Sequence, residues 1–292
     1  MSNKVFFVTN ASSKTGSFIA KLMLEDGKYT IRLGTRDPSK LSEFHAQGAE
    51  VVHVDHTLQS NIEAFKNVDG IYIVLPALIQ NAEHSLLENY IKAAKDTNVK
   101  HIVYLSAIDV DVKSYHRHKE YEKMVFDSKI PYTILRPTWF HENVVTYHAT
   151  SVKKEGVFRT SASDGVYTSV AIADIAAVAV EVLTNPEQHV GKIYTLTGEA
   201  LSEKKVAQIL SKVIGKEVKH VNLTPEEHTT LLKKTYVGWK SPEEFVNALV
   251  LLDKNKRDNL FNVVDPTLEH VLGRKAISLE EVLIMNASAF KD

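Results

Sequence analysis

The chain has 292 residues, which is enough for one large α/β domain or for a core domain with a smaller lobe. Its composition, 44% hydrophobic and 24% charged, is that of an ordinary soluble globular protein. With 35 basic and 36 acidic residues, the net charge is −1, so no electrostatic argument favours nucleic acid or an anionic membrane as a partner. The lack of cysteine excludes disulfides, thiolate nucleophiles and thiol metal sites.

The N-terminus runs straight into an apolar stretch without a signal-peptide pattern, and no apolar run approaches ~18 residues. We therefore expect a soluble, cytoplasmic protein that does not enter a membrane. The sequence does not define an oligomeric state.

The first sixteen residues predict a strand, a tight polar turn and a helix. Val5 to Val8 are four consecutive apolar residues, typical of a strand buried in a parallel sheet. Dinucleotide-binding folds hold the cofactor pyrophosphate at such a turn, against the exposed N–H groups of the helix N-terminus. Where the usual fingerprint G-x-x-G-x-x-G has its glycines, this chain has Asn10, Ser13 and Gly16.

Two of the three glycines are therefore replaced. Asn10 suits the turn because asparagine tolerates positive φ. The other turn residues that can donate hydrogen bonds or charge to a phosphate are Ser12, Ser13, Lys14 and Thr15. The alternative is an ordinary strand–helix turn without a ligand.

Strand and helix patterns continue to alternate through the first half of the chain. The predicted strands are 29–35, 50–55, 70–76, 101–106 and 131–136, and the predicted helices are 39–47, 58–65, 81–97 and 115–128. Six strands at this spacing predict a doubly wound parallel α/β sheet with right-handed crossovers.

After residue 137 the alternation loosens and helices dominate. We predict strands at 157–159 and 192–197 and helices at 170–183, 202–214 and 278–286, with further helix starts at 224 and 241. The predicted first domain is 1–155, joined by sheet-packing segments from 166–197. Residues 156–292 are predicted to form a smaller, mostly helical lobe for a substrate or a partner.

Arg36 follows the second predicted strand, 20 residues after Gly16. An acidic residue at this point binds the ribose of NAD, whereas an arginine accommodates the 2′-phosphate of NADP. Lys40 adds a second positive charge, although Asp37 lies between them. We therefore expect NADP(H) to be preferred over NAD(H). The alternative is a solvated surface arginine.

Two further strand-end residues are candidate cofactor contacts. Asp55 ends the third strand, close to where an adenine lies in this fold. Pro76 ends the fourth strand, where the backbone runs along the pyrophosphate and ribose. Both residues are equally compatible with ordinary strand ends.

Several motifs together resemble the NmrA-like branch of the atypical short-chain dehydrogenases, over about residues 4 to 183. They include Gly-Thr-Arg36-Asp-Pro, Val-Tyr-Leu-Ser106, Tyr-Thr-Ile-Leu-Arg136-Pro and Phe140-His-Glu-Asn143. This resemblance implies an NAD(P)-binding Rossmann fold that prefers NADP(H). The glycine-poor turn departs from the family pattern. One interpretation is that this chain is a relative that no longer binds the dinucleotide.

The activities of that family divide into two classes. Some members resemble reductases of quinones, dyes, imines or activated double bonds. Others sense NADP(H) and regulate a protein partner without turnover. Fold alone does not separate the two. We favour an NADPH-dependent reductase of a small flat acceptor, with the sensor as the alternative.

The resemblance also indicates where catalysis would occur. Ordinary short-chain dehydrogenases use a serine, a tyrosine and a lysine four residues after the tyrosine. Ser106, Tyr115 and Lys119 fit that spacing. Aligning on the glutamate of the NmrA-like branch instead pairs His118 with Glu122, one residue or about 100° of helix away. We favour the region of His118 and Lys119 as the lining of the site, with Lys119 and Ser106 also near the cofactor.

The segment after the sixth strand supplies candidate substrate contacts. Trp139 and Phe140 are suited to an apolar wall for a flat molecule, and Asn143 follows at the carboxyl edge of the sheet. Aromatic residues at such positions are also common in cores. The thirteen histidines show no metal-ligand spacing, because His116 and His118 are two apart and point to different helix faces, so we expect no metal site.

Overall fold

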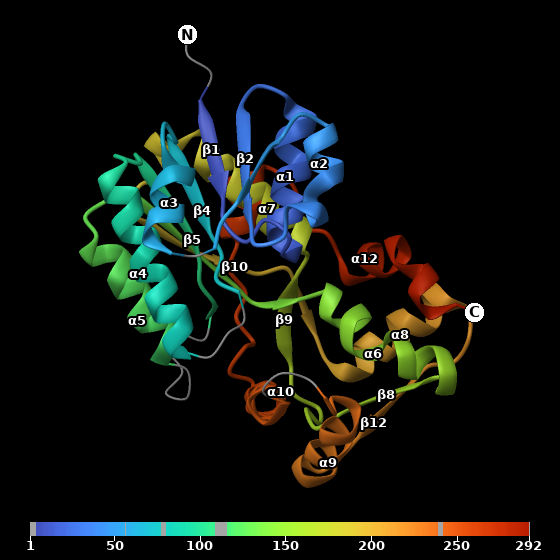
Figure 1. Ribbon diagram of the computed structural model, residues 1–292. Helices are drawn as coiled ribbons and strands as arrows, with labels where there is room; N and C mark the ends of the chain where they lie inside the picture. Colours follow the sequence, from blue (N-terminus) through green and yellow to red (C-terminus); the bar gives the residue numbers. More distant parts are fainter. Residues whose placement is uncertain (1–3, 56, 77–79, 109–115, 239–241, 292) are drawn as a thin grey trace. The chain divides into compact units, whose positions relative to one another are not determined.

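The computed structural model describes residues 4–55, 57–76, 80–108, 116–238 and 242–291, and the chain divides into two compact units (Figure 1). Unit 1 comprises Met1–Pro137, Ile172–Leu196 and Thr267–Lys275. Unit 2 comprises Thr138–Ala171, Thr197–Pro266 and Ala276–Asp292. Each unit is therefore assembled from three separate stretches of chain.

Unit 1 is built on a seven-stranded, fully parallel sheet in the order β10-β6-β5-β4-β1-β2-β3. Its strands are β1 (Val5–Val8), β2 (Thr30–Thr35), β3 (Glu50–His53), β4 (Gly70–Ile73), β5 (His101–Leu105), β6 (Tyr132–Pro137) and β10 (Lys192–Leu196). The strand order reverses direction between β1 and β4, the point at which doubly wound sheets bind ligands. The predicted doubly wound α/β fold is confirmed.

Helices cover both faces of this sheet (Figure 1). They are α1 (Lys14–Asp26), α2 (Ser42–Ala46), α3 (Leu58–Phe65), α4 (Gln80–Asp96), α5 (His116–Asp127), α7 (Ile172–Thr184) and α11 (Thr267–Leu272), with 3₁₀ turns η1 (Pro38–Leu41) and η3 (Pro186–Gln188). α1 packs on α7, and α3 on α4. The core between the sheet and α3–α5 contains Phe7, Phe65 and Tyr90, all nearly inaccessible to solvent.

Unit 2 combines helices with two small sheets. Its strands are β7 (Trp139–Phe140), β8 (Val157–Thr160), β9 (Tyr167–Val170), β11 (Glu199–Leu201) and β12 (Lys219–Asn222). Its helices are α6 (Glu142–Glu155), α8 (Glu203–Ile214), α9 (Pro225–Thr235), α10 (Pro242–Arg257) and α12 (Leu279–Met285), with a 3₁₀ turn η4 (Ala287–Phe290). One sheet has the order β11-β9-β7, and the other pairs β12 with β8. The helices expected here are present, and most of these short strands were not predicted.

Candidate functional site

The turn after β1 uses side chains where the usual fingerprint has glycine. Asn10 adopts φ +44°, the left-handed conformation that the sequence predicted for it. Its carbonyl oxygen accepts a 2.8 Å hydrogen bond from the backbone N–H of Ser13. The Ser13 hydroxyl in turn caps α1, accepting from the backbone N–H of Gly16 at 3.2 Å. The turn is therefore closed and ordered without the first two glycines.

Gly16 allows the helix N-terminus to approach the turn closely. A Cβ atom at this position would lie 2.9 Å from Cα of Ala11 and 3.0 Å from the carbonyl oxygen of Asn10, so close to the backbone that something would have to shift. The N-terminus of a helix carries partial positive charge, which favours an anion beside it. The retained glycine therefore fits a phosphate cradle.

A cavity of about 240 Å³ lies beside this turn, at the carboxyl end of β2. We call it the Arg36 cavity, and its lining residues are Asn10, Ser12, Thr35, Arg36, Asp37 and Lys40. Arg36 and Lys40 are exposed and bring two positive charges.

Asp37 supplies the opposing charge in this cavity, but its carboxylate is engaged locally. It accepts hydrogen bonds from the backbone N–H of Ser39 at 3.2 Å and from its hydroxyl at 2.6 Å. The Ser39 hydroxyl holds the pKa of Asp37 below its usual value. The two cations Arg36 and Lys40 remain the groups suited to an added phosphate.

The remaining predicted cofactor contacts differ in accessibility. Lys14 is exposed, whereas Thr15 is buried in α1. Asp55 is exposed after β3 and accepts hydrogen bonds from the backbone N–H and the hydroxyl of Thr57, at 2.9 and 2.7 Å. Those bonds lower the pKa of Asp55. Pro76 is partly buried beyond the end of β4.

A buried ionic network ties α5 to the carboxyl ends of β5 and β6. Glu122, which is 2% exposed, accepts 2.9 and 2.6 Å hydrogen bonds from the Arg136 guanidinium, one on each carboxylate oxygen. The Ser106 hydroxyl donates to Glu122 Oε1 at 2.6 Å. Bidentate charge-assisted pairs of this kind fix geometry as well as adding stability. The network engages the hydroxyl of Ser106. Its Glu–Arg pair was not predicted, although Arg136 lies in a quoted motif and Glu122 was considered as a neighbour of His118.

The two candidate site residues on α5, His118 and Lys119, have different environments. His118 precedes the buried Glu122 by one turn and packs against Tyr121, with ring centroids 6.3 Å apart. Among the described residues its buried Nδ1 atom has no hydrogen-bond partner, and burial lowers the pKa of His118 to about 4. Lys119 is exposed. Tyr115 lies outside the described residues.

The predicted substrate contacts lie at the start of unit 2. Trp139, in β7, stacks on Tyr147 with ring centroids 6.0 Å apart and an interplanar angle of 27°. Phe140 is partly buried and Asn143 is buried. Of the three predicted residues, Trp139 is the one that lines a cavity of about 300 Å³ within unit 2.

Within the described ranges, no three His, Asp or Glu side chains are grouped so that they could hold a metal ion. Nor does any helix in that part of the chain combine the length and apolar character needed to cross a bilayer.

Comparison with known proteins agrees with this geometry. The NAD(P)H-binding family matches residues 11–186, from the turn after β1 to η3. The chain belongs to the NAD(P)H-binding family. The match spans more than half of the chain and includes Ser12, Gly16, Arg36 and Lys40, so dinucleotide binding is the shared property of the family to which these residues belong.

Two curated relatives match nearly the whole chain. The NAD(P)H azoreductase of Xenophilus azovorans is 29% identical, over 98% of this chain and 99% of its own length. Quinone oxidoreductase 2 of Escherichia coli K12 is 31% identical, over 94% of this chain and 96% of its own length. The solved complex of that oxidoreductase with NADPH has a TM-score of 0.86 to this chain, covering 97% of it and 99% of the solved chain, at 28% identity.

A third similar protein is the Citrobacter triphenylmethane reductase in complex with NADP(H), with a TM-score of 0.86 and 26% identity over 97% of this chain and 99% of its own. The negative transcriptional regulator NmrA shares the fold, with a TM-score of 0.75 at 13% identity over 97% of this chain and 95% of its own. The resemblance to NmrA-like atypical short-chain dehydrogenases is confirmed.

Proposed function

We propose that this protein is a reductase that uses NADPH in preference to NADH and delivers hydride to a small flat acceptor such as a quinone or a dye. The Arg36 cavity carries the proposal, because it places two exposed cations beside the phosphate-binding turn. The relatives reported above are a quinone oxidoreductase, an azoreductase and a triphenylmethane reductase, and two of them have solved complexes with NADPH or NADP(H).

In this proposal the turn and the strand ends hold the dinucleotide. Asn10, Ser12, Ser13, Lys14 and Gly16 surround the phosphates, and the N-terminus of α1 supplies favourable partial charge.

At the other end of the dinucleotide, Arg36 and Lys40 bind the 2′-phosphate, with Asp55 near the adenine and Pro76 along the ribose. Thr15 is buried, so its part is to seat α1 rather than to contact a ligand.

The bound dinucleotide would supply the hydride, and the chain would position the acceptor and manage the proton. His118 is neutral at pH 7, because the pKa of its ring is lowered to about 4, so it offers a ring nitrogen without a positive charge. Lys119 is exposed and therefore accessible to a ribose hydroxyl. Ser106 positions α5 through Glu122. Tyr115 is the proton donor that the resemblance to short-chain dehydrogenases implies.

Cofactor preference is tested by titrating NADPH and NADH into the purified protein and following nucleotide fluorescence. Arg36→Ala should weaken NADPH by about 1–3 kcal/mol, the range for a charge-assisted hydrogen bond, and leave NADH nearly unchanged. Lys28→Ala, at an exposed lysine that donates a 2.6 Å hydrogen bond to Asp26, is the matched control. Equal affinity for the two nucleotides in the unmodified protein would contradict the NADP(H) preference.

Turnover is tested with NADPH and a panel of quinones, azo dyes, triphenylmethane dyes and enones. Oxidation of NADPH that depends on the acceptor supports the reductase. Tight NADPH binding with no oxidation across the panel favours a sensor that regulates a partner protein. Tyr115→Phe, His118→Ala and Lys119→Ala should lower kcat if the residue positions the acceptor or the proton, and should raise the nucleotide Kd if it contacts the cofactor.

A further inference from the structure

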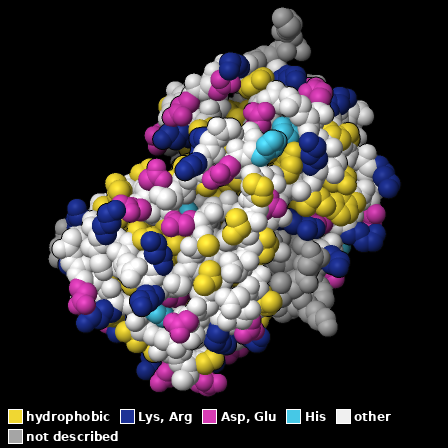
Figure 2. Space-filling view, turned by 180° about the vertical axis from the view of Figure 1, so that it is seen from behind, with side chains coloured by type: hydrophobic (Ala, Val, Ile, Leu, Met, Phe, Trp, Pro, Cys, Tyr) yellow, Lys and Arg dark blue, Asp and Glu magenta, His cyan; other side chains and the backbone are white. Residues whose placement is uncertain are grey.

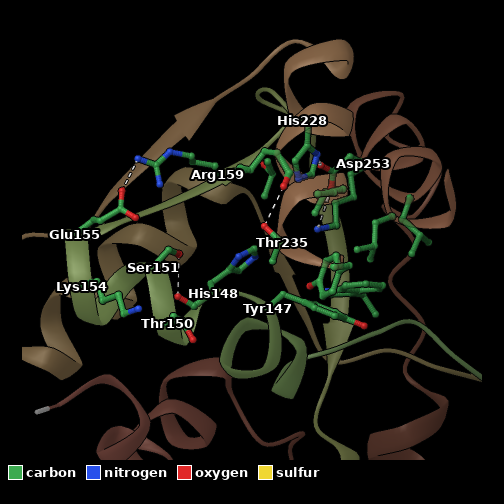
Figure 3. Close-up of a pocket in the computed structure, with 18 residues that line it drawn as sticks. Tyr147, His148, Thr150, Ser151, Lys154, Glu155, Arg159, His228, Thr235 and Asp253 are labelled. Carbon is green, nitrogen blue, oxygen red and sulfur yellow. Dashed lines mark hydrogen bonds and ion pairs between the residues drawn. The ribbon is translucent and has the colours of Figure 1, made fainter. Parts of the chain in front are cut away.

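Unit 2 contains a partly open cavity, and one of its lining residues is Trp139, which is also a predicted acceptor contact. Its volume is about 300 Å³, at the lower end of the range for small-molecule sites. Side chains from α6, β8, α9 and α10 form its walls (Figure 3). We call it the lobe pocket.

One end of the lobe pocket is aromatic and apolar. Trp139 stacks on Tyr147, and Tyr147 packs on Phe245 with centroids 6.3 Å apart. Tyr236 meets the same Phe245 edge to face at 4.9 Å. Leu232 continues this surface. Such an arrangement presents flat ring faces held by their neighbours, which favours a planar ligand.

The other end is polar and has an excess of positive charge. Figure 3 shows Lys154, Glu155 and Arg159 together at one side of the pocket, with Tyr147 and Asp253 at the other and His148 between them. Arg159 Nη2 contacts Glu155 at 2.6 Å, which balances that pair. Lys154 is exposed and makes no ion pair or hydrogen bond with any described residue. Its ammonium group is therefore available to an anion.

The deep wall of the pocket is fixed by a separate buried ionic network. Lys256 Nζ lies 3.0 Å from Glu203 Oε1 and 3.8 Å from Asp253 Oδ1, and Asp253 Oδ2 lies 3.0 Å from His228 Nδ1. Because Lys256 pairs with Glu203 and Asp253, its ammonium group is not available to a ligand. Its Nζ instead lies 5.0 Å from the centre of the Trp139 ring, a cation–π contact that holds the aromatic wall in place.

We propose that the lobe pocket binds a planar aromatic molecule that carries one acidic group, with the ring at Trp139 and Tyr147 and the acidic group at Lys154. An aromatic carboxylate and an aromatic sulfonate share this chemistry. All lining residues of the pocket belong to unit 2, so the proposal does not depend on the assignment of a dinucleotide to unit 1, although the pocket shares Trp139 with the predicted acceptor wall.

The test is calorimetric titration of the full-length protein, without nucleotide, with 2-naphthoate and with its uncharged counterpart 2-naphthamide. Naphthoate should bind more tightly than naphthamide. Lys154→Gln should weaken naphthoate about five- to tenfold, the effect of losing one partly solvated charge contact, and should change naphthamide little. Lys233→Gln, at an exposed lysine outside the pocket, is the matched control and should change neither ligand.

A second variant pair tests the aromatic end. Trp139→Leu should weaken both ligands, and Trp139→Phe, which keeps a ring, should restore most of the affinity. The absence of binding heat for both ligands in the unmodified protein overturns the proposal, as does naphthoate binding that neither Lys154→Gln nor Trp139→Leu weakens. A failed titration of this kind leaves NADPH binding and acceptor turnover unaffected, so it is distinguishable from failure of the proposed reductase.

Discussion

The two units assemble their polar groups in opposite ways. In unit 1 the Arg36 cavity comes from two short stretches, 10–12 and 35–40, whose polar side chains lie at strand ends. In unit 2, Lys256 bonds Glu203 across 53 residues, and the carboxylate of Asp253 accepts from the backbone N–H of Ser161 across 92. The local groups remain open to a ligand, whereas the distant groups satisfy one another inside the protein. In these two clusters, the groups that are close in sequence are open to a ligand, and the groups that are far apart in sequence stabilise the interior.

The strongest test of this contrast removes the cation of the unit 2 network. Lys256→Met should lower the free energy of unfolding by about 3–5 kcal/mol, because Glu203 and Asp253 would be left buried without their partner. Denaturant titration followed by circular dichroism measures the loss. Lys254→Met, at an exposed lysine paired with Asp258, should cost less than about 1 kcal/mol. Equal effects of the two variants would contradict the buried network.

Unit 1 contains the buried Glu122–Arg136 network, and breaking it tests whether burial alone determines the cost in stability. Glu122→Gln keeps the shape of the side chain but leaves Arg136 without its bidentate partner. We expect a loss of about 2–3 kcal/mol in the free energy of unfolding, less than for Lys256 because the Arg136 side chain is 21% exposed. Glu120→Gln, at an exposed glutamate on the same helix, is the control. A cost as small as that of the control would rule out a stabilising role for the pair.

The turn after β1, where we propose that the phosphates bind, should tolerate less change than its exposure suggests. Gly16→Ala places a methyl group within 2.9 Å of Cα of Ala11, so the helix N-terminus must move away from the turn. We expect about 1–3 kcal/mol lower stability and about tenfold weaker NADPH binding. Thermal unfolding and nucleotide fluorescence measure the two effects. Unchanged affinity would show that the close approach is not used for the dinucleotide.

The smallest expected effect is a pH dependence of stability. His101 is buried in β5, and burial lowers its pKa to about 4 from the usual 6.5. Between those two values the unfolded chain binds more protons than the folded one, so stability falls as the pH decreases. From pH 7 to pH 6 this single histidine should contribute roughly 0.5–1 kcal/mol of loss. His101→Leu should reduce the slope of unfolding free energy against pH, and an unchanged slope would contradict the assignment.

Periodicity and turn chemistry predicted most of unit 1. All six strands of the first half lie where alternation placed them, and Ser202 and Gly215 bound α8 as the helix-capping rules expect. The strands β7, β9, β11 and β12 were not predicted, because segments of two to four residues carry too little periodicity.

The site residues likewise divide into those that the sequence predicted and those that only the structure brings together. Asn10 and Arg36 belong to one short-range pattern, and the structure places both in the Arg36 cavity. The lobe pocket joins Trp139 to residues near 155, 230 and 250, and no sequence spacing relates them. The bonds of Glu122 to Ser106 and Arg136 likewise connect separate elements.

The interleaving of the two units governs how the chain can be divided or made. The polypeptide passes between units after Pro137, Ala171, Leu196, Pro266 and Lys275. Most of unit 2 is therefore synthesised before α11, which belongs to unit 1. The last segment of unit 2 follows α11, so neither unit is complete until the end of the chain is being made. A fragment ending at Pro266 lacks α11 from unit 1 and α12 from unit 2. Isolating either unit requires rejoining three segments with new linkers, and a simple truncation damages both.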